Sequence, residues 1–481
     1  MKTAYFTPLN PMRSGISDFA EEMLPCLAEQ MDITLFADCK PTNPAIRDHF
    51  TCFDISQFAA KAAEENYQFC IYQVGNNYKF HKPIVECFMK NGGILELHDI
   101  SLHRFVAEAT VAAGNMDAYV ESMHYCHGFQ GEQAAKNYCQ GYAPPPWEDS
   151  TLEFTLNKQL IDRAHAVIVH SDFAKQMVKG VRKNVPVIVI PLPSDLIVDN
   201  PSAYQRKCRQ ALGIDENILV LGSFGYINRY KRIPQILRAL ARFKKETKIP
   251  FHYYLVGHND GQKLDGLLRE LGLSEQVTQL GFTSSKEEFC QYIGACDICL
   301  NLRYPTQGES SGGVHRMLGM GKAVVMSDSG SFAEYPDNAV VKIRPDEKEE
   351  DALCTALKRL ALNRTDLESL GQNALAYARQ ECDPEKNAVR YASFLARLTS
   401  GGIREHGIER FVDRQMCIRD RACFFPCFLR SRRSLRLWNS SRSVWFAQPT
   451  RDSFLRKSRS IVSGFLFAFC FKTCKQKMQI I

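Results

Sequence analysis

The stretch ICLNLRYPTQGESSGGVHRMLGMGKAVVMS at residues 298–327 holds two short apolar runs, separated by a turn-rich loop and an amphipathic segment. The runs at 298–302 and 323–326 are rich in aliphatic residues, which is typical of buried strands. Residues 311–320 place apolar side chains three and four positions apart and predict a helix. A strand, a helix and a second strand in this order form a βαβ unit, which indicates a parallel sheet and an α/β fold.

The same alternation extends in both directions and occurs twice within residues 1–400. In the first series, strands are expected at 2–6, 33–36, 69–74, 93–97, 166–170 and 186–190. In the second series, strands are expected at 218–223, 251–256, 277–280, 298–302, 323–326 and 340–343. The proline-rich segment 191–194 separates the two, because proline does not donate to a strand ladder.

We therefore predict two doubly wound, Rossmann-like domains facing across a cleft, where such sheets commonly bind ligands. The expected domain boundaries are 1–190, with inserted helices at about 101–160, then 191–384, and a closing helix at 385–398.

Composition excludes several classes of protein. The chain has 481 residues, of which 45% are hydrophobic and 23% charged, as in soluble globular proteins. No apolar run reaches the ~18–20 residues of a membrane helix, and residues 1–8 predict a buried strand rather than a signal peptide. The 18 cysteines are scattered through apolar segments. We interpret them as reduced thiols and expect a cytoplasmic protein.

The basic character of the chain belongs to residues 401–481. The formal net charge is +7, yet this tail carries 17 Lys and Arg against 5 Asp and Glu, so residues 1–400 have a net charge of −5. The main part therefore gives no indication of nucleic-acid binding. The string RQMCIRDR at 414–421 resembles a translated sequencing adapter. We interpret 401–481 as a non-native or disordered tail; a native tail that binds a membrane surface is the alternative.

A helix start rich in serine and glycine is the strongest chemical motif. It consists of Glu309, Ser310, Ser311 and Gly312. Backbone N–H groups and the helix dipole at such a start bind anions such as a diphosphate. The Glu309 carboxylate is able to accept hydrogen bonds from sugar hydroxyls. An ordinary helix cap followed by a glycine turn is the competing interpretation, which the short string alone fits better.

Two further loops follow the first strand of each series. The loop after the strand at 218–223 contains a glycine and three cations, namely Gly225, Arg229, Lys231 and Arg232. Such cations neutralise phosphate charge, although a solvated turn is the alternative. After the strand at 2–6, Ser14 and Gly15 lead into a helix and allow a phosphate to approach closely. This second loop is a weak signal by itself because it lacks the GxGxxG spacing.

His98 and Asp99 follow the strand expected at 93–97. We expect both to point into the cleft, where His98 would bond a sugar hydroxyl or lie near the reacting carbon. A helix-capping Asp with a neighbouring His is equally compatible with the sequence. The spacing of metal-ligand residues is poor, since Cys296 and Cys299 lack a second pair, and we expect no metal site. Nucleophile-elbow and Walker A motifs are also lacking.

Taken together, these elements resemble the GT-B-fold glycosyltransferases of family 4, which are retaining enzymes that use nucleotide sugars. The segment NPMRSGISDF at 10–19 is similar to the "SGI-D" opening of one branch, and residues 97–99 match its His-Asp segment. The loop at 225–231 is similar to the donor-site loop. Residues 304–325 match the "GE-SG" helix of the branch and the strand that follows it. The similarity spans about residues 1–398.

The resemblance implies a retaining, metal-independent hexosyltransferase without a cofactor. It would move a sugar from a nucleoside-diphosphate sugar to a glycan or lipid-linked acceptor, in cell-surface polysaccharide synthesis. The first domain would lie on the acceptor side, and the second would bind the nucleotide sugar. No nucleic acid is expected as a partner, and peripheral contact with the inner face of the membrane is one option.

The resemblance also implies a set of site residues. Lys231 would contact the donor diphosphate, together with backbone amides of the "GE-SG" helix and the Gly15 loop. The catalytic candidates are His98, Asp99, Lys231 and Glu309. The donor-binding candidates are Ser14, Gly15, Gly225, Arg229, Lys231, Arg303, Glu309, Ser310, Ser311, Gly312 and Arg316.

Two positions depart from the family pattern. That pattern has two glutamates eight residues apart, where this chain has Gly308 and Arg316, and Glu309 is expected to replace the first. Tyr226 stands where the donor loop carries an arginine, for which Arg229, Arg303 or Arg316 would compensate. A catalytically silent sugar-nucleotide-binding subunit and a GT-B-fold sugar-nucleotide epimerase are the alternatives.

Overall fold

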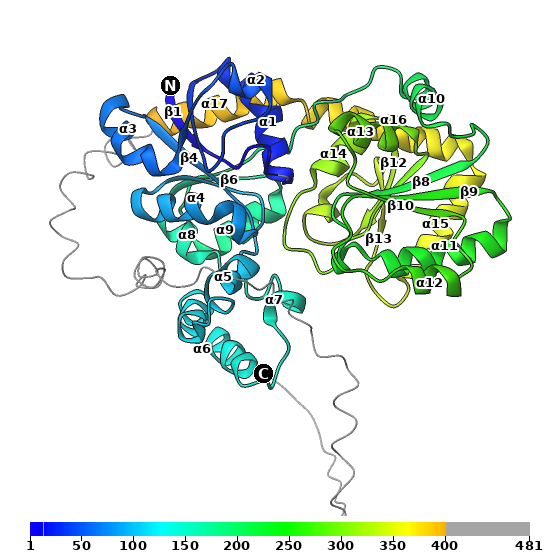
Figure 1. Ribbon diagram of the computed structural model, residues 1–481, viewed down its shortest axis with the longest axis horizontal. Coiled ribbons are helices and arrows are strands. Elements are labelled where there is room, and N and C mark those ends of the chain that lie inside the picture. The colour runs from blue at the N-terminus through cyan, green and yellow to red at the C-terminus, as the bar shows by residue number, and fades with distance from the viewer. Residues whose placement is uncertain (13, 401–481) are drawn as a thin grey trace, which may run out of the picture. The chain divides into compact units, whose positions relative to one another are not determined.

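A computed structural model describes residues 1–12 and 14–400 and contains two parallel β-sheets with helices packed on them (Figure 1). The first sheet has the strand order β3-β2-β1-β4-β5-β6-β7, and the second has the order β10-β9-β8-β11-β12-β13. Each sheet starts at an inner strand and grows outward in both directions, which is the doubly wound topology. The tail at 401–481 lies outside the described residues.

Most strands are buried on both faces, which explains why they are continuous apolar runs in the sequence. The first sheet contains β1 (Lys2–Phe6), β2 (Asp32–Ala37), β3 (Thr51–Asp54), β4 (Phe69–Val74), β5 (Gly93–Leu97), β6 (Ala164–Val169) and β7 (Val187–Val189). The second contains β8 (Leu219–Phe224), β9 (Phe251–Val256), β10 (Val277–Gly281), β11 (Ile298–Asn301), β12 (Ala323–Ser327) and β13 (Val340–Ile343).

Most helices connect successive parallel strands, whereas α10 links the two sheets and α15 to α17 follow the last strand. Those of the first half are α1 (Gly15–Ala28), α2 (Pro44–Arg47), α3 (Phe58–Glu65), α4 (Tyr78–Asn91), α5 (His103–Thr110), α6 (Met116–Cys139), α7 (Pro146–Asp149), α8 (Lys158–Arg163) and α9 (Asp172–Val181). Those of the second half are α10 (Pro201–Leu212), α11 (Ile233–Thr247), α12 (Asp265–Glu270), α13 (Lys286–Ala295), α14 (Gly312–Gly319), α15 (Glu349–Leu362), α16 (Arg364–Glu381) and α17 (Pro384–Ser400). Helices α5 to α8 all lie between β5 and β6, in the region where inserted helices are expected.

The last described helix, α17, returns to the first sheet and packs along α1. Its apolar side chains join the core that contains Tyr5 of β1 and Phe19 of α1. The Tyr391 hydroxyl of α17 donates a short hydrogen bond to Glu96 in β5. The core of the first domain is therefore completed by residues from the far end of the described chain.

Every strand expected from the sequence is present, with small shifts at the ends. The expectation missed β3 and α10. Strand β3 lies at the edge of its sheet and is half exposed, so it lacks the apolar run of a buried strand. Helix α10 has a mostly polar sequence and is supported by the Asn200 side chain, which caps its first turn, and by packing against α13.

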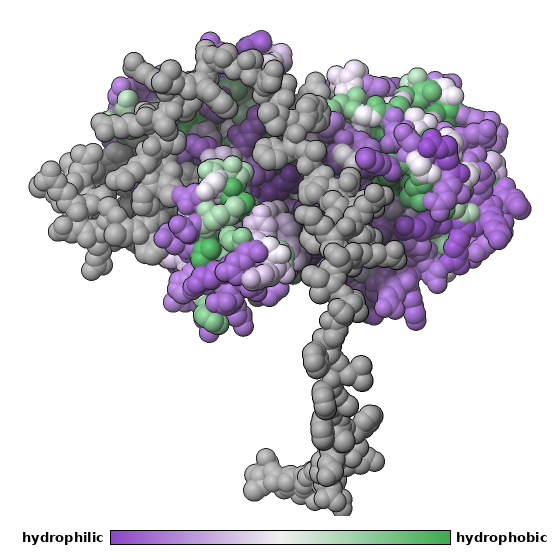
Figure 2. Space-filling view, turned by 60° about the horizontal axis from the view of Figure 1, so that its bottom comes forward, coloured by the Kyte–Doolittle hydropathy of each residue, from purple (hydrophilic) through white to green (hydrophobic). Residues whose placement is uncertain are grey.

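Within residues 1–12 and 14–400, no helix is long and apolar enough to cross a membrane. On the face shown in Figure 2, hydrophobic residues form small groups among hydrophilic ones. Two of the most exposed aromatic side chains lie in the inserted region, namely Phe129 in α6 and Tyr142 just after it.

Candidate functional site

A buried lysine lies where two central strands of the second sheet end. Lys231 closes the short 3-10 turn Arg229–Lys231 that follows β8, and only 4% of it is exposed. Its ammonium donates to the Phe224 carbonyl oxygen at 2.8 Å and to the Asn301 side-chain oxygen at 3.3 Å. Burial, and then the charge of Arg303, lower the pKa of Lys231 well below its ordinary value. A negatively charged ligand would offset both effects.

Glu309 organises the loop between β11 and α14. One carboxylate oxygen accepts from the Arg303 guanidinium at 2.7 Å. The other accepts from the Thr306 hydroxyl at 2.9 Å and from the Gln307 backbone N–H at 2.6 Å. Both oxygens thus already have protein partners. If Glu309 accepts hydrogen bonds from sugar hydroxyls, as expected, these must share its oxygens with Arg303, Thr306 and Gln307.

The start of α14 has the geometry of an anion site. Ser311 is the N-cap residue, yet its side chain caps no backbone N–H group. A Cβ atom added at Gly312 would meet no described atom within 4 Å, so a ligand has room to approach the backbone. The Ser310 hydroxyl donates to the His170 carbonyl oxygen at 3.4 Å. The uncapped N–H groups remain available for an oxyanion.

The first domain contacts this loop through Asp99 and Asn76. The Asp99 carboxylate accepts from the Asn76 backbone N–H at 2.7 Å, and the Asn76 side-chain amide donates to the Gln307 side-chain oxygen at 2.7 Å. Burial, and then the negative charge of Glu309, raise the pKa of Asp99 to about 6. Asp99, Glu309 and Lys231 thus form one electrostatic cluster, to which both domains contribute.

The loop between β1 and α1 forms a second helix start, in the first domain. The Ser14 hydroxyl accepts from the backbone N–H groups of Ile16 and Ser17 and caps α1. The Ser14 hydroxyl oxygen is therefore already engaged in capping α1. Gly15 resembles Gly312, because an added Cβ atom would meet no described atom within 4 Å.

Two cations expected at the donor site face acidic side chains instead. Arg229 forms ion pairs with Glu148 at 2.7 Å and with Asp149 at 2.6 Å, both in α7 of the inserted region. Arg316 is buried and forms a short ion pair with Glu22 of α1. These two arginines link the two halves of the chain and do not join the Lys231 cluster.

Gly225 lies next to that cluster, with a φ of +90° that favours glycine.

His98 lies in a different environment from Asp99. Its ring packs against Phe19 and against His170, with ring centroids 4.8 Å and 4.5 Å apart. The charges that lower the pKa of His98, after burial itself, are those of His170 and His81. Glu309 therefore acts on the pKa of Asp99 and is not among the charges that act on His98.

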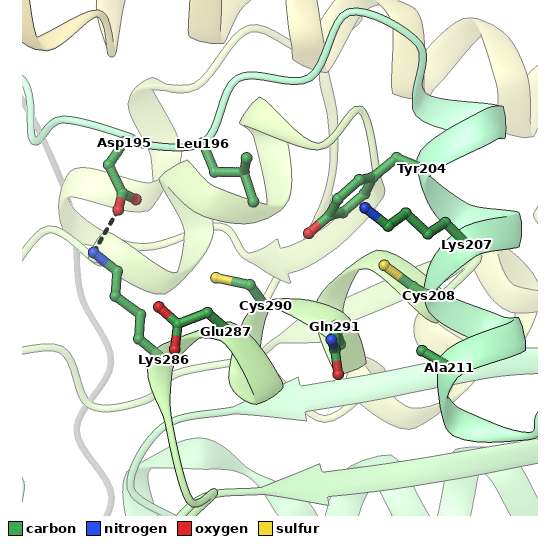
Figure 3. A pocket seen from close by; sticks show the side chains of 10 residues that line it. All are labelled: Asp195, Leu196, Tyr204, Lys207, Cys208, Ala211, Lys286, Glu287, Cys290 and Gln291. Carbon is green, nitrogen blue, oxygen red and sulfur yellow. Dashed lines mark hydrogen bonds and ion pairs between the residues drawn. The ribbon is translucent and has the colours of Figure 1, made fainter.

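A separate cavity of about 250 Å³ lies between α10 and α13 (Figure 3). Tyr204 and Cys208 of α10 face Cys290 of α13 across it, and Lys286 reaches Asp195 at 2.5 Å beside it. None of the residues of the Lys231 cluster lines this cavity.

Asn76, Asn301 and Gln307 were not predicted as site residues. Asn301 ends the quoted strand β11, and a polar side chain at the carboxyl end of a parallel strand is the signal that would have found it. Asn76 lies two residues after β4 and carries the same signal, whereas Gln307 lacks it and takes its role from its partner Asn76 in the other half of the chain.

Comparison with known proteins tests the fold and the second domain. Residues 205–376 match the family model of glycosyl transferases, group 1. This segment contains β8 to β13 together with Lys231 and Glu309. The match supports a glycosyltransferase. No curated protein matches the sequence.

Three solved structures illustrate the similarity of the whole chain. The Anabaena protein HepE in complex with UDP is 18% identical, with a TM-score of 0.58, over 83% of this chain and 100% of that one. Sucrose-phosphate synthase from Thermosynechococcus elongatus is 15% identical, with a TM-score of 0.58, over 84% and 100%. WaaG, a glycosyltransferase involved in lipopolysaccharide biosynthesis, is 14% identical, with a TM-score of 0.54, over 82% and 99%.

The fold is GT-B. At these identities the likeness concerns the fold alone, and it confirms the predicted α/β architecture of two Rossmann-like domains. In this GT-B fold, the Lys231 cluster lies at the carboxyl ends of β8 and β11, next to the start of α14. This is the edge at which open α/β sheets bind their ligands.

Proposed function

We propose that the protein is a retaining glycosyltransferase that transfers a sugar from a nucleoside-diphosphate sugar to a glycan or lipid-linked acceptor. The observation that carries the proposal is the buried Lys231 ammonium at the carboxyl end of β8, close to the loop that leads into the uncapped start of α14. A buried cation and a helix N-terminus together stabilise the charge of a diphosphate leaving group. The match of residues 205–376 to a glycosyltransferase family supports the same conclusion.

The proposed mechanism needs no metal at the donor. Negative charge develops on the diphosphate as the bond to the sugar breaks, and Lys231 with the α14 amide groups would stabilise it. The diphosphate would then help to deprotonate the acceptor on the same face of the sugar, so that the anomeric configuration is retained. Closure of the domains over the donor would exclude water.

The proposal also includes the position of the acceptor and the cellular location of the enzyme. We place the acceptor on the side of the inserted helices α5 to α8, where the exposed Phe129 and Tyr142 offer apolar contact to a lipid-linked glycan. A cytoplasmic enzyme of cell-surface polysaccharide synthesis, in peripheral contact with the inner membrane face, would present α6 in this way. Vesicle flotation with and without the exchange Phe129→Ser tests this placement, and equal flotation of both proteins would contradict it.

A thermal-shift screen of the full chain with UDP-, GDP-, ADP- and dTDP-sugars, with and without EDTA, tests the donor site. A donor present at 100 times its Kd adds ~2.7 kcal/mol to the free energy of unfolding. A shift with one nucleotide class that EDTA does not reduce is the expected result. No shift with any nucleotide sugar would contradict the proposed donor site.

One observation favours a second candidate function, a catalytically silent sugar-nucleotide-binding subunit. Both oxygens of Glu309 are engaged within the protein, and Arg316 is paired with Glu22. Transfer of a radiolabelled sugar to a panel of glycan acceptors distinguishes the two. Donor binding without any transfer would favour the silent subunit, and sugar interconversion without acceptor would identify an epimerase.

A further inference from the structure

Three side chains that commonly bind metals meet inside the first domain. Glu96 lies in β5, and His98 follows two residues later, so both point to the same side of the strand. His170 directly follows β6, which pairs with β5 in parallel register. Glu96 is fully buried, and only 9% of His98 and 6% of His170 are exposed.

Each of the three contributes one buried atom with no hydrogen-bond partner among the described residues. These atoms are Glu96 Oε1, His98 Nε2 and His170 Nε2. All three lie within 4.8 Å of one another, and the Glu96 oxygen is 3.8 Å from the His170 nitrogen. Buried polar atoms are almost always paired, so three unpaired atoms this close to one another suggest that the site accepts an occupant.

The remaining polar atoms of the cluster are positioned as in metal sites. His170 Nδ1 is 2.8 Å from the Ile190 carbonyl oxygen. A carbonyl only accepts, so Nδ1 carries the hydrogen and Nε2 presents its lone pair to the cluster. The second oxygen of Glu96 accepts from the Gln73 amide at 3.1 Å and from the Tyr391 hydroxyl. Such outer hydrogen bonds fix the orientation of metal ligands.

We propose that Glu96, His98 and His170 bind a structural Zn²⁺ ion in the first domain. Two imidazole nitrogens and one carboxylate oxygen form a ligand set typical of zinc, with a water molecule completing the tetrahedron. The ion joins the ends of β5 and β6 and, through the Glu96–Tyr391 hydrogen bond, fixes α17 to the sheet. His98 is then a metal ligand, separate from the Lys231 cluster.

The first test is the metal content of the full-length protein, purified after growth with added ZnCl₂ and measured by plasma mass spectrometry. We expect about one zinc ion per chain. The chain also has many cysteines, which bind zinc as thiolates. Exchange of the zinc for cobalt, followed by absorption spectroscopy, distinguishes the proposed cluster from a cysteine site. Cobalt bound by thiolates gives strong near-ultraviolet bands, whereas cobalt bound by two histidines and a glutamate gives only the visible bands of a four-coordinate ion.

Variants assign the ion to this cluster. The exchange Glu96→Gln keeps an acceptor for Tyr391 but removes the charged ligand, and His98→Gln removes an imidazole. Each should lower zinc affinity at least ~100-fold, more than the loss of an outer hydrogen bond does. His252→Gln is the control, since His252 lies in the second sheet and bonds to Thr278 at 2.8 Å. It should retain the ion.

Two outcomes would overturn the proposal, and neither depends on transferase activity. One is a folded wild-type protein that contains no zinc and whose Tm does not change with ZnCl₂, which would indicate a buried water molecule in the cluster. The other is full zinc retention in both ligand variants. If the variants do not fold, the cobalt spectrum of the wild-type protein still decides between this cluster and the cysteines.

Discussion

At the scale of single residues, Lys231 is the side chain whose environment is most difficult to explain without a ligand. It is buried beside the Arg303 guanidinium, which lowers the pKa of Lys231 more than the Glu309 carboxylate raises it, and its hydrogen bonds go to two neutral oxygens. A buried ammonium beside another cation is costly unless an anion binds there. The ligand that the proposal assigns to this place, a diphosphate, carries the matching charge.

Exchange of Lys231 for methionine should therefore lower kcat/KM for sugar transfer by the equivalent of ~2–4 kcal/mol, because one charge that stabilises the leaving group is lost. Steady-state kinetics measure the effect. Lys322→Met is the matched control, since Lys322 is equally buried but donates to the Gly294 and Cys296 carbonyl oxygens, away from the cluster. Unchanged kinetics of the Lys231 variant would remove it from the site.

Asp99 should make stability depend on pH. Its pKa rises from 3.8 to about 6 on folding, so the folded protein binds the proton more tightly than the unfolded chain. The stability that this proton contributes is complete below about pH 4 and is lost as the pH rises through about 6. Asp99→Asn should remove this loss. Urea unfolding between these pH values measures it, with Asp260→Asn at an exposed position as control. Parallel pH profiles of wild-type protein and the Asp99 variant would disprove the assignment.

At the scale of elements, a negative charge added at the start of α14 should have opposite effects on the stability of the protein and on donor binding. A negative charge at a helix N-terminus stabilises the helix by ~0.3–1 kcal/mol, and the same charge repels a diphosphate. Gly312→Asp should therefore raise the Tm slightly while it weakens the donor-induced thermal shift. Gly266→Asp at the start of α12 is the control, because its added Cβ also meets no described atom. That variant should bind donor normally. A donor shift of unchanged size in the Gly312 variant would place the diphosphate elsewhere.

The strands and their loops also show how much of the fold and of the candidate site the sequence predicts. Central parallel strands are apolar on both faces, and all of those expected were found. Lys231 and Glu309 were proposed from local sequence alone, Lys231 from a loop with three cations after a strand and Glu309 from a helix start rich in serine and glycine. The partners of Arg229 and Arg316 could not be predicted. Glu148 and Glu22 lie 81 and 294 positions away in the chain, and their contacts depend on how the two domains fold around one another.

At the scale of the whole molecule, the ion pair between Glu22 and Arg316 joins the two domains. Both side chains are buried, and removal of Arg316 takes away the larger of the two positive charges that act on the Glu22 carboxylate. Arg316→Met should reduce the free energy of unfolding by ~3–5 kcal/mol, toward the lower value because Lys286 also contacts Glu22 at 2.7 Å. Guanidinium unfolding measures the loss. The exposed pair Arg364–Glu368 provides the control, as Arg364→Met should cost less than ~1 kcal/mol. A loss no larger than the control's would show that the pair does not form in solution.

The return of α17 to the first sheet also has a consequence during synthesis on the ribosome. The core around Tyr5 and Phe19 needs Tyr391, Phe394 and Leu395, which are translated only after both sheets have been made. The nascent first domain therefore waits with an open apolar face while the second domain emerges and folds. Chaperones that hold such surfaces should bind the nascent chain for most of its translation, and release should follow the exit of α17 from the ribosome.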